Sequence, residues 1–213
     1  MVSRLISELE KQLKLQLPGI EVQNKMAPLK IKEREAFRKN YPQKGGVLVL
    51  LYPAGNSIKI ALMLRPENMG VHSDQVSFPG GKFEQGDETM ENTALREAKE
   101  ELGIEPSKIK LIGALTELYI PASNFVVYPF LAVSEVRPDF VPHSVEVKKI
   151  IEMDIVQLLD ESIVKSKPVF MSVLGKELVV PYFDFEGHTI WGATAMILGE
   201  LKELLKRTGL IFS

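Results

Sequence analysis

The amino-acid sequence predicts an α/β fold in a single domain with additional helices at its two ends. Three observations support this prediction. The chain has 213 residues and is 45% hydrophobic, which suits one globular domain. Strand-like apolar runs alternate along it with segments of helical periodicity. No internal repeat, low-complexity tract or flexible linker divides the sequence.

Residues 1–44 are expected to form a helix and an arm outside the main domain, which runs from residue 45 to residue 213. The apolar residues of the first segment recur at helical spacing as far as Pro18, namely Val2, Leu5, Ile6, Leu9, Leu13 and Leu17. Charged residues interrupt this segment, so we do not expect a signal peptide. No apolar run approaches the roughly 20 residues of a membrane helix. We therefore expect a soluble, cytoplasmic protein without a membrane partner.

The next segments are an arm, a β-hairpin and a helix. In the polar stretch 23–44, IKEREAFRKNY could form a short helix or wrap the core. VLVLLYP and IKIALMLRP flank AGNS, whose Gly55-Asn56 pair is a turn signal. A looser segment, PENMGVHSDQVSFPGG, ends in two glycines. A helix then runs from about Met90 to Leu102, and Gly103 is expected to end it as a C-cap residue.

Strands resume after this helix. We expect one strand in KLIGALTEL and one in NFVVYPFLAVSEV, separated by the loop at Pro121. The short segment VEVKKIIEM and the helix-like DIVQLLDESI follow. Two further strands are expected around PVFMSVLG and ELVVPYFDF, with Gly187 in a turn. The chain closes with a helix from about Ala193 to Lys206, and we assign Trp191 to packing against this helix.

Composition excludes several classes of function. The net charge is −2 and there is no long basic run, so a nucleic-acid partner is not expected. The absence of cysteine excludes disulfides, thiolate metal sites and cysteine nucleophiles. The sequence contains no G-x-G-x-x-G, P-loop or G-x-S-x-G motif. The histidines have no spacing that favours a metal site.

The predicted helix at 90–102 carries a cluster of carboxylates. Its apolar residues lie on one stripe, and Glu97 and Glu101 border that stripe one turn apart, with Glu100 beyond them. Like charges at this spacing repel each other. Either the cluster is a solvated face neutralised by Arg96 and Lys99, or a cation lies among the carboxylates. Because the ligands would all be oxygen atoms, a hard divalent cation such as Mg²⁺ or Mn²⁺ fits the second alternative.

Residues 80–104, GGKFEQGDETMENTALREAKEELGI, resemble the signature of Nudix hydrolases, G-x5-E-x7-R-E-U-x-E-E-x-G-U with U aliphatic. The second half matches at every fixed position, namely Arg96, Glu97, Ala98 in the aliphatic slot, Glu100, Glu101, Gly103 and Ile104. The first half is one residue longer. Counting from Gly81 puts Asp87 at the acidic position, whereas counting back from Arg96 puts Glu88 there.

This longer loop is similar to the branch of the family that includes coenzyme A diphosphatases. That branch also has an upstream element ending in FPGG, and residues 65–81 have the same length. Gly70 and Asp74 depart from it, because the branch usually has a basic residue and a glycine there. PASNFVVYPFLAV and VPYFDFEGHTIWGATAMIL look like later parts of the same branch. The resemblance covers about residues 46–205 and implies a Nudix α/β/α sandwich around a mixed β-sheet.

The resemblance also implies the site. The metal ligands for Mg²⁺ or Mn²⁺ would be Glu97, Glu100, Glu101 and the Gly81 carbonyl. The catalytic candidates are Glu100 and Glu101 of the signature, Arg96, and Glu146 as an acid outside the signature. Glu100 is either a ligand or the base, and Arg96 is expected to orient a glutamate, with Asp87 or Glu88 as its partner. The substrate-binding candidates are Arg65, His72, Gln75 and Lys82.

Hydrolysis of coenzyme A or an acyl-coenzyme A, giving 3′,5′-ADP and 4′-phosphopantetheine, is the leading functional expectation. One alternative is a Nudix pyrophosphohydrolase for ADP-ribose or other dinucleotides. Another is a Nudix-fold nucleotide sensor without catalysis, and a third is a purely structural acidic helix. The apolar end Leu210-Ile211-Phe212 could dock on its own core or form a homodimer.

Overall fold

The computed structural model describes residues 2–67, 75–171 and 174–210. Its helices are α1 (Val2–Leu13), α2 (Gly19–Met26), α3 (Ile31–Ala36), α4 (Met90–Leu102), α5 (Ile155–Leu159) and α6 (Gly192–Arg207). Its strands are β1 (Gln43–Ala54), β2 (Ser57–Leu64), β3 (Val76–Ser77), β4 (Gly80–Lys82), β5 (Lys110–Ala114), β6 (Leu118–Ile120), β7 (Phe125–Val133), β8 (Lys149–Asp154), β9 (Val164–Met171), β10 (Lys176–Phe185) and β11 (His188–Ile190).

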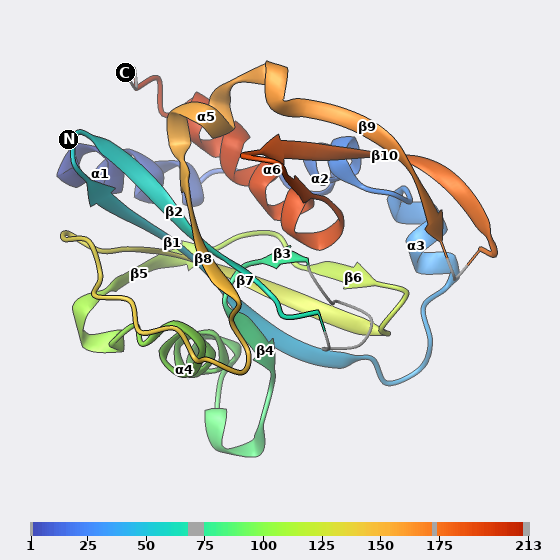
Figure 1. The fold of residues 1–213 in the computed structure, drawn as a ribbon, viewed down its shortest axis with the longest axis horizontal. Helices are drawn as coiled ribbons and strands as arrows, with labels where there is room; N and C mark the ends of the chain where they lie inside the picture. Colours follow the sequence, from blue (N-terminus) through green and yellow to red (C-terminus); the bar gives the residue numbers. More distant parts are fainter. Residues whose placement is uncertain (1, 68–74, 172–173, 211–213) are drawn as a thin grey trace.

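Strand β1 lies at the centre of the main sheet (Figure 1). In the described residues this sheet has eight strands in the order β3-β2-β1-β7-β5, with β4 on β1, β6 on β7 and β8 on β2. β1 is antiparallel to β2 and β4 but parallel to β7, so the sheet is mixed. The Gly55-Asn56 turn joins β1 and β2, as the sequence predicts.

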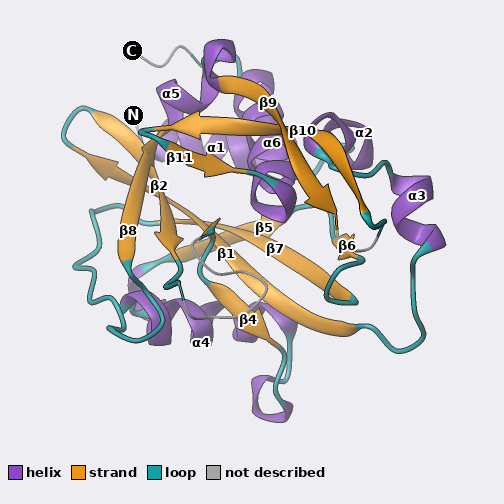
Figure 2. Cartoon of the chain, turned by 45° about the vertical axis from the view of Figure 1, so that its right-hand side comes forward, coloured by secondary structure: helices purple, strands orange, loops and turns teal. Residues whose placement is uncertain are grey.

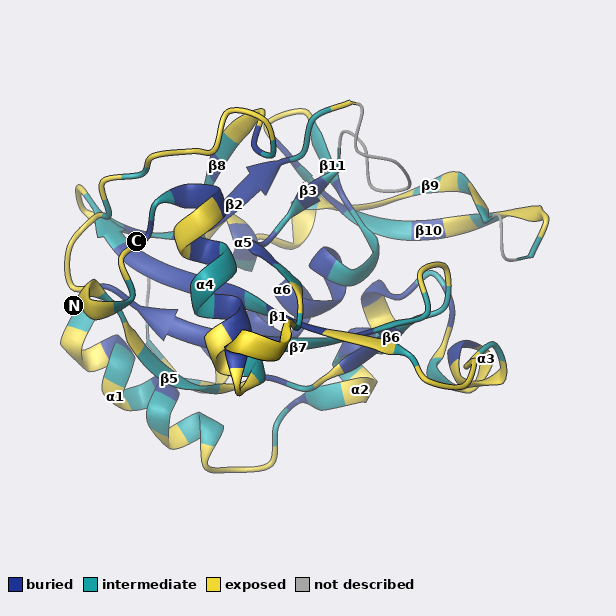
Figure 3. Ribbon diagram, turned by 90° about the horizontal axis from the view of Figure 1, so that it is seen from below, coloured by how far each residue is buried: buried dark blue, intermediate teal, exposed yellow. Residues whose placement is uncertain are grey.

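Both faces of β1 are buried, which explains why its sequence is a nearly continuous apolar run. Leu48 and Leu50 contribute to the core beneath α4, whereas Val49 and Leu51 contribute to the core on the opposite face, with α6. Figure 1 shows α4 below the sheet and α6 above it. In Figure 3 the central strands are dark blue, while α1, α3 and β9 carry exposed residues. The sheet is therefore sandwiched between helical layers.

Helix α4 has the bounds that the sequence predicts. The hydroxyl of Thr89 accepts a hydrogen bond from the Asn92 N–H at 3.1 Å and caps the start of the helix. Gly103 has a φ of 70°, the left-handed conformation of a C-cap glycine. The backbone of β1 lies directly against the first residue of α4, since a Cβ added to Gly46 would be 2.2 Å from the Met90 carbonyl oxygen. These contacts fix α4 against the sheet.

Some details of the sequence-based prediction are wrong, since the looser segment before α4 contains β3 and β4, and β11 was not expected. The KLIGALTEL segment forms two strands, β5 and β6, because the Thr116 N–H between them donates to the buried Glu200 carboxylate, 3.2 Å from Oε2, instead of to a neighbouring strand. Helix α2, after Pro18, was not expected as a separate element. It is attached to α6 because Gln23 Nε2 also donates to Glu200, 3.1 Å from Oε2.

The strands β11-β10-β9 pair with one another as a second sheet, and β11 lies beside β3 of the main sheet. Figure 2 shows α6 between the two sheets, in agreement with Figure 1. α6 agrees within one residue with the predicted closing helix. Leu210 packs against the α6 side of the core, and the other two residues of the apolar end, Ile211 and Phe212, lie outside the described residues. In the described ranges, no helix has the length and apolar character needed to cross a membrane.

Candidate active site

The carboxylate of Glu101 is buried between α4 and the edge of the main sheet. Its side chain is only 1% exposed. Oε2 accepts a hydrogen bond from the Gly80 N–H at 2.8 Å, and Oε1 lies 3.5 Å from Arg65 Nη2. The apolar stripe of α4 forces this position, because Glu101 lies beside Ala98 and Leu102 on the face that packs against the sheet.

Glu97 lies one turn earlier on α4, against the second glycine of the FPGG element. A Cβ on Gly81 would lie 2.3 Å from Glu97 Oε1, so the carboxylate occupies space that only glycine leaves open. The Glu97 side chain is mostly buried. The FPGG element therefore contributes a backbone N–H to one glutamate and room for the other.

Arg96 is surrounded by three carboxylates. It forms a bidentate pair with Asp87, in which Nε lies 2.7 Å from Oδ1 and Nη2 lies 3.0 Å from Oδ2. Its Nη1 lies 3.0 Å from Glu97 Oε1 and 2.9 Å from Glu100 Oε2. Asp87 is the partner of Arg96 in this structure, whereas Glu88 is exposed and has a φ of 60°.

The cluster shifts the pKa values of its carboxyl groups in opposite directions. Burial raises the pKa of Glu101 to about 8, and nearby Glu97 and Glu146 act in the same direction. Burial also raises the pKa of Glu97, while Arg96 lowers it in part. By contrast, Arg96 holds the pKa of Asp87 well below its usual range. Asp87 and Arg96 therefore form a stable ion pair, and Glu97 and Glu101 resist carrying negative charge.

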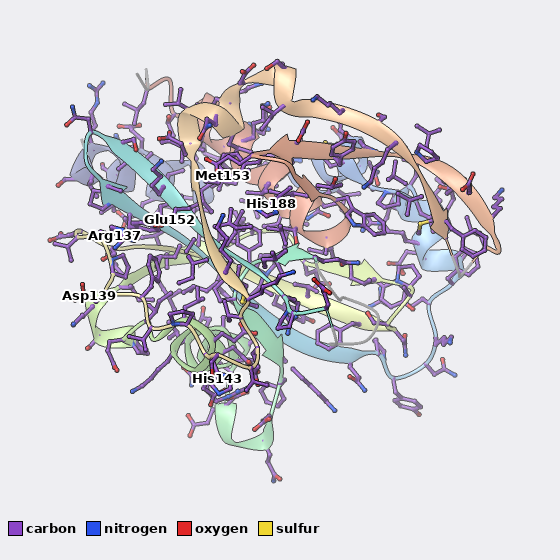
Figure 4. The ribbon with its side chains drawn as sticks, in the orientation of Figure 1. Arg137, Asp139, His143, Glu152, Met153 and His188 are labelled. Carbon is purple, nitrogen blue, oxygen red and sulfur yellow. The ribbon has the colours of Figure 1, made fainter. Side chains whose placement is uncertain are left out.

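Glu146 comes from a different part of the chain but acts on the same carboxylates. It lies in a turn that precedes β8, and its charge raises the pKa values of both Glu97 and Glu101. The loop before this turn is attached to the end of α4, because the His143 N–H donates to the Glu101 carbonyl oxygen at 2.8 Å. Figure 4 shows His143 beside α4, whereas His188 lies far from it.

The chemistry of this cluster fits a divalent cation. Glu97, Glu101 and Glu146 repel each other in a poorly solvated region, and carboxylate oxygens are the ligands that Mg²⁺ and Mn²⁺ prefer. In the described residues, no three acidic or histidine side chains already converge as a metal cage. Glu97 and Glu100 instead contact Arg96, and Glu101 contacts Arg65. A cation would thus compete with the two arginines for these carboxylates.

A pocket of about 630 Å³ opens beside the acidic cluster. Arg65, Gly80 and Gly81 line it, and these residues also border the Glu101 and Glu97 carboxylates. Segments far apart in the chain supply mostly apolar walls, which include Leu29, Phe125, Phe170, Met171, Trp191 and Ile197. The volume is in the range of small-molecule binding sites.

The substrate-binding candidates from the sequence meet at this pocket where the structure describes them. Arg65, Gln75 and Lys82 all line it, whereas His72 lies outside the described residues. Trp191, which the sequence assigns to packing, also lines the pocket.

One pocket residue, Arg34 of α3, is missing from the sequence-based candidates. The side chain is buried, although the IKEREAF segment that carries it reads as a polar arm. The only signal in the sequence is its place three residues after Ile31, on the same side of a short helix.

Similar proteins agree with this arrangement. A family model described as "NUDIX domain" matches residues 42–173, well over half of the chain. "Nudix hydrolase 15, mitochondrial" of Arabidopsis thaliana is 29% identical over 183 residues, which cover 83% of this chain and 62% of the relative. "Nudix hydrolase 22, chloroplastic" of the same plant is 30% identical over 183 residues, which cover 83% of this chain and 57% of the relative. The chain thus spans about three fifths of the length of these curated relatives.

Among solved structures, a Nudix hydrolase from M. smegmatis, RenU, is similar with a TM-score of 0.52. The match has 17% sequence identity and covers 80% of this chain and 91% of that one. Identity at this level supports the fold alone. The family match rests on residues 42–173, which contain α4, the FPGG element and Glu146. This chain belongs to the Nudix domain family.

Proposed function

We propose that this protein hydrolyses the diphosphate bridge of a nucleoside diphosphate-linked compound and needs Mg²⁺ or Mn²⁺ to do so. One observation carries the proposal. Arg65, Gly80 and Gly81, which border the Glu97 and Glu101 carboxylates, also line a pocket large enough for a nucleotide-type ligand. A substrate in this pocket would therefore have its phosphates next to the acidic cluster.

Glu97, Glu101, Glu100 and the Gly81 carbonyl are the groups that would hold the cation. When bound, a divalent cation supplies positive charge to phosphate oxygens and lowers the pKa of a water molecule. Gly80 keeps the Glu101 side chain in place through its N–H, and Arg96 keeps Glu97 and Glu100 on one side of α4. The two hydrogen bonds to Asp87 hold Arg96 itself.

The remaining roles concern the substrate and the proton. Arg65 and Lys82 line the pocket next to the cluster, so their positive charges would bind the diphosphate. Glu146 lies close enough for its charge to act on the same carboxylates, and it would accept the proton of the attacking water. Glu100 is the alternative base, and its partly exposed side chain can move away from Arg96.

Coenzyme A or an acyl-coenzyme A is the proposed substrate, with 3′,5′-ADP and 4′-phosphopantetheine as products. The lengthened loop with Asp87 and the preceding FPGG element support this choice. The mostly apolar walls of the pocket also suit a ligand with an adenine ring and an uncharged pantetheine chain.

The experiment is a hydrolysis panel with Mg²⁺ or Mn²⁺ that contains coenzyme A, ADP-ribose, NADH and a dinucleotide polyphosphate. We expect coenzyme A to be cleaved fastest and mass spectrometry to identify the two fragments. Faster cleavage of ADP-ribose or of a dinucleotide would reject the coenzyme A assignment but keep the diphosphate chemistry. If the protein binds nucleotides without metal and hydrolyses none of them, its function is that of a nucleotide sensor and not of an enzyme.

The matched variants for this panel come from α4. Glu97→Gln removes a negative charge from the cluster and keeps the shape of the side chain, so it should abolish most of the activity. Glu91→Gln changes an exposed residue in the first turn of the same helix and should leave the activity unchanged.

A further inference from the structure

Arg34 is a buried arginine whose charge has no counter-ion among the described residues. Its relative exposure is 3%. The Nε and Nη2 atoms have no hydrogen-bond partner in the described part of the chain, and Nη1 contacts only the Met196 sulfur, at 3.8 Å. Glu35, the adjacent acidic residue, instead holds Arg38 with Nη1–Oε distances of 2.9 and 3.1 Å. Burying a guanidinium whose donors have no partner lowers the stability of the folded state, so its position calls for an explanation.

The helix that carries Arg34 is fixed at both of its ends. Helix α3 is anchored at its start, where the Ile31 N–H donates to Asn24 Oδ1 at 3.0 Å. Just beyond its end, the Tyr119 hydroxyl donates to the Phe37 carbonyl oxygen at 3.2 Å. Arg38 also lies over the Tyr119 ring, 5.1 Å from its centroid. Arg34 is therefore part of an arm that is fixed to β6.

Arg34 lines the same pocket as Arg65 and Gly81, but it comes from the N-terminal arm. This arm lies outside the residues 42–173 that match the family model. Burial lowers the pKa of the Arg34 guanidinium from its usual value, as expected for a cation in apolar surroundings, and Glu35 acts in the opposite direction. Among the described residues, the neighbouring walls, such as Leu29 and Met196, offer it no negative charge.

We propose that Arg34 binds a second phosphate group of the substrate, a phosphate monoester on the nucleotide that is separate from the diphosphate to be cleaved. A phosphate monoester supplies two negative charges and several acceptor oxygens, which match the fork of free guanidinium donors. The inference rests on the proposed function, because the phosphate is carried by the nucleotide that the pocket holds. In this proposal the N-terminal arm takes part in selecting the substrate, because it carries Arg34.

The test compares the binding of 3′,5′-ADP with that of 5′-AMP by calorimetry in a chelator-containing buffer, where no hydrolysis takes place. The two probes differ by one phosphate monoester. We expect the wild-type protein to bind 3′,5′-ADP roughly 10- to 100-fold more tightly, the gain typical of hydrogen bonds to a charged group. Arg34→Met should remove this preference and leave the affinity for 5′-AMP unchanged. Lys32→Met, an exposed position on the same helix, should keep the preference.

Arg34→Lys is the second variant, because it keeps the charge but loses the fork of donors, and it should keep part of the preference. The melting temperature of Arg34→Met without ligand should equal or exceed that of the wild type, since the variant removes an unpaired buried charge. A wild-type protein that binds both probes equally would overturn the proposal. The proposal would also be overturned if Arg34→Met had a lower melting temperature than the wild type and lost affinity for both probes to the same extent. In that case Arg34 would stabilise the fold and not bind a phosphate.

These outcomes are separate from the hydrolysis panel. If coenzyme A is not cleaved but the phosphate preference depends on Arg34, the proposed reaction fails while the phosphate site stands. If coenzyme A is cleaved but Arg34→Met keeps the preference, the reaction stands and the phosphate site fails.

Discussion

Arg96 and Asp87 form a two-point ion pair, with Nε–Oδ1 at 2.7 Å and Nη2–Oδ2 at 3.0 Å. The Asp87 side chain is 4% exposed and also accepts hydrogen bonds from the Thr93 hydroxyl and from the Glu84 N–H, both at 2.9 Å. The pair joins the loop after β4 to α4, and the same guanidinium contacts Glu97 and Glu100. Asp87 thus determines the position of the residue that orients the acidic cluster.

Asp87→Asn should therefore destabilise the protein. The substitution removes a buried charge that is fully hydrogen-bonded and leaves Arg96 without its strongest partner. We expect the free energy of unfolding at pH 7 to fall by roughly 1–3 kcal/mol, measured by urea denaturation. Glu88→Gln is the control, because Glu88 is exposed, and it should change stability by less than about 0.5 kcal/mol. Equal effects of the two substitutions would contradict this account of the loop.

The raised pKa of Glu101 leads to a prediction of how the stability of chelator-treated protein depends on pH. Burial raises its pKa from 4.5 in the unfolded chain to about 8, so between these values the folded state holds a proton that the unfolded state has lost. The free energy of unfolding should therefore decrease as the pH rises from about 5 to 8. The raised pKa of Glu97 adds to this trend.

Glu101→Gln should flatten that decrease, because glutamine does not ionise and its oxygen still accepts from the Gly80 N–H. Urea denaturation at pH 5, 6, 7 and 8 measures the slopes for both proteins. Parallel curves for the variant and the wild type would mean that Glu101 is not the group responsible. The same variant should lose hydrolysis, so stability and activity should change in opposite directions at pH 8.

Gly81→Ala should reduce activity through a steric effect on Glu97. The added Cβ would lie 2.3 Å from Glu97 Oε1, so the carboxylate must move away from the position it now has beside the pocket. We expect a stability loss of roughly 1–3 kcal/mol together with a large loss of metal-dependent turnover. Gly86→Ala is the matched control in the next loop, since no heavy atom of the residues that the structure describes lies within 4 Å of its added Cβ. Full activity of Gly81→Ala would show that the position of Glu97 is unimportant.

Glu146→Gln tests the assignment of the base. If Glu146 accepts the proton of water, kcat should fall by roughly 10²- to 10⁴-fold with little change in KM. Glu135→Gln, an exposed position after β7, should leave kcat unchanged. A normal kcat in Glu146→Gln would transfer the role to Glu100, for which Glu100→Gln is the corresponding variant.

Local signals explain which parts of the fold could be predicted. The bounds of α4, Met90 and Leu102, could be predicted because a Thr cap precedes the helix and Gly103 ends it. The β1–β2 hairpin follows from two apolar runs around Gly55-Asn56. The border position of Glu97 and Glu101 follows from helical periodicity alone, and the structure places Glu101 in the core.

Contacts between distant segments could not be predicted in the same way. Helix α2 and the break between β5 and β6 both depend on Glu200, a residue of α6 that is remote in sequence. Counting along the motif left Asp87 and Glu88 as equal partners for Arg96, and only the folded loop distinguishes them. Arg34 reads as one charge in a polar arm, because the pocket that it lines is completed by residues of β6 and α6.

The claim that the α4 glutamates hold a divalent cation is tested most directly by Mn²⁺ titration followed by electron paramagnetic resonance. Wild-type protein and Glu91→Gln should bind Mn²⁺ with the same affinity. Glu97→Gln and Glu101→Gln should each weaken it by at least about tenfold, since even the outer partners of metal ligands typically contribute that much. Mn²⁺ affinities that are unchanged in both of these variants would contradict the account.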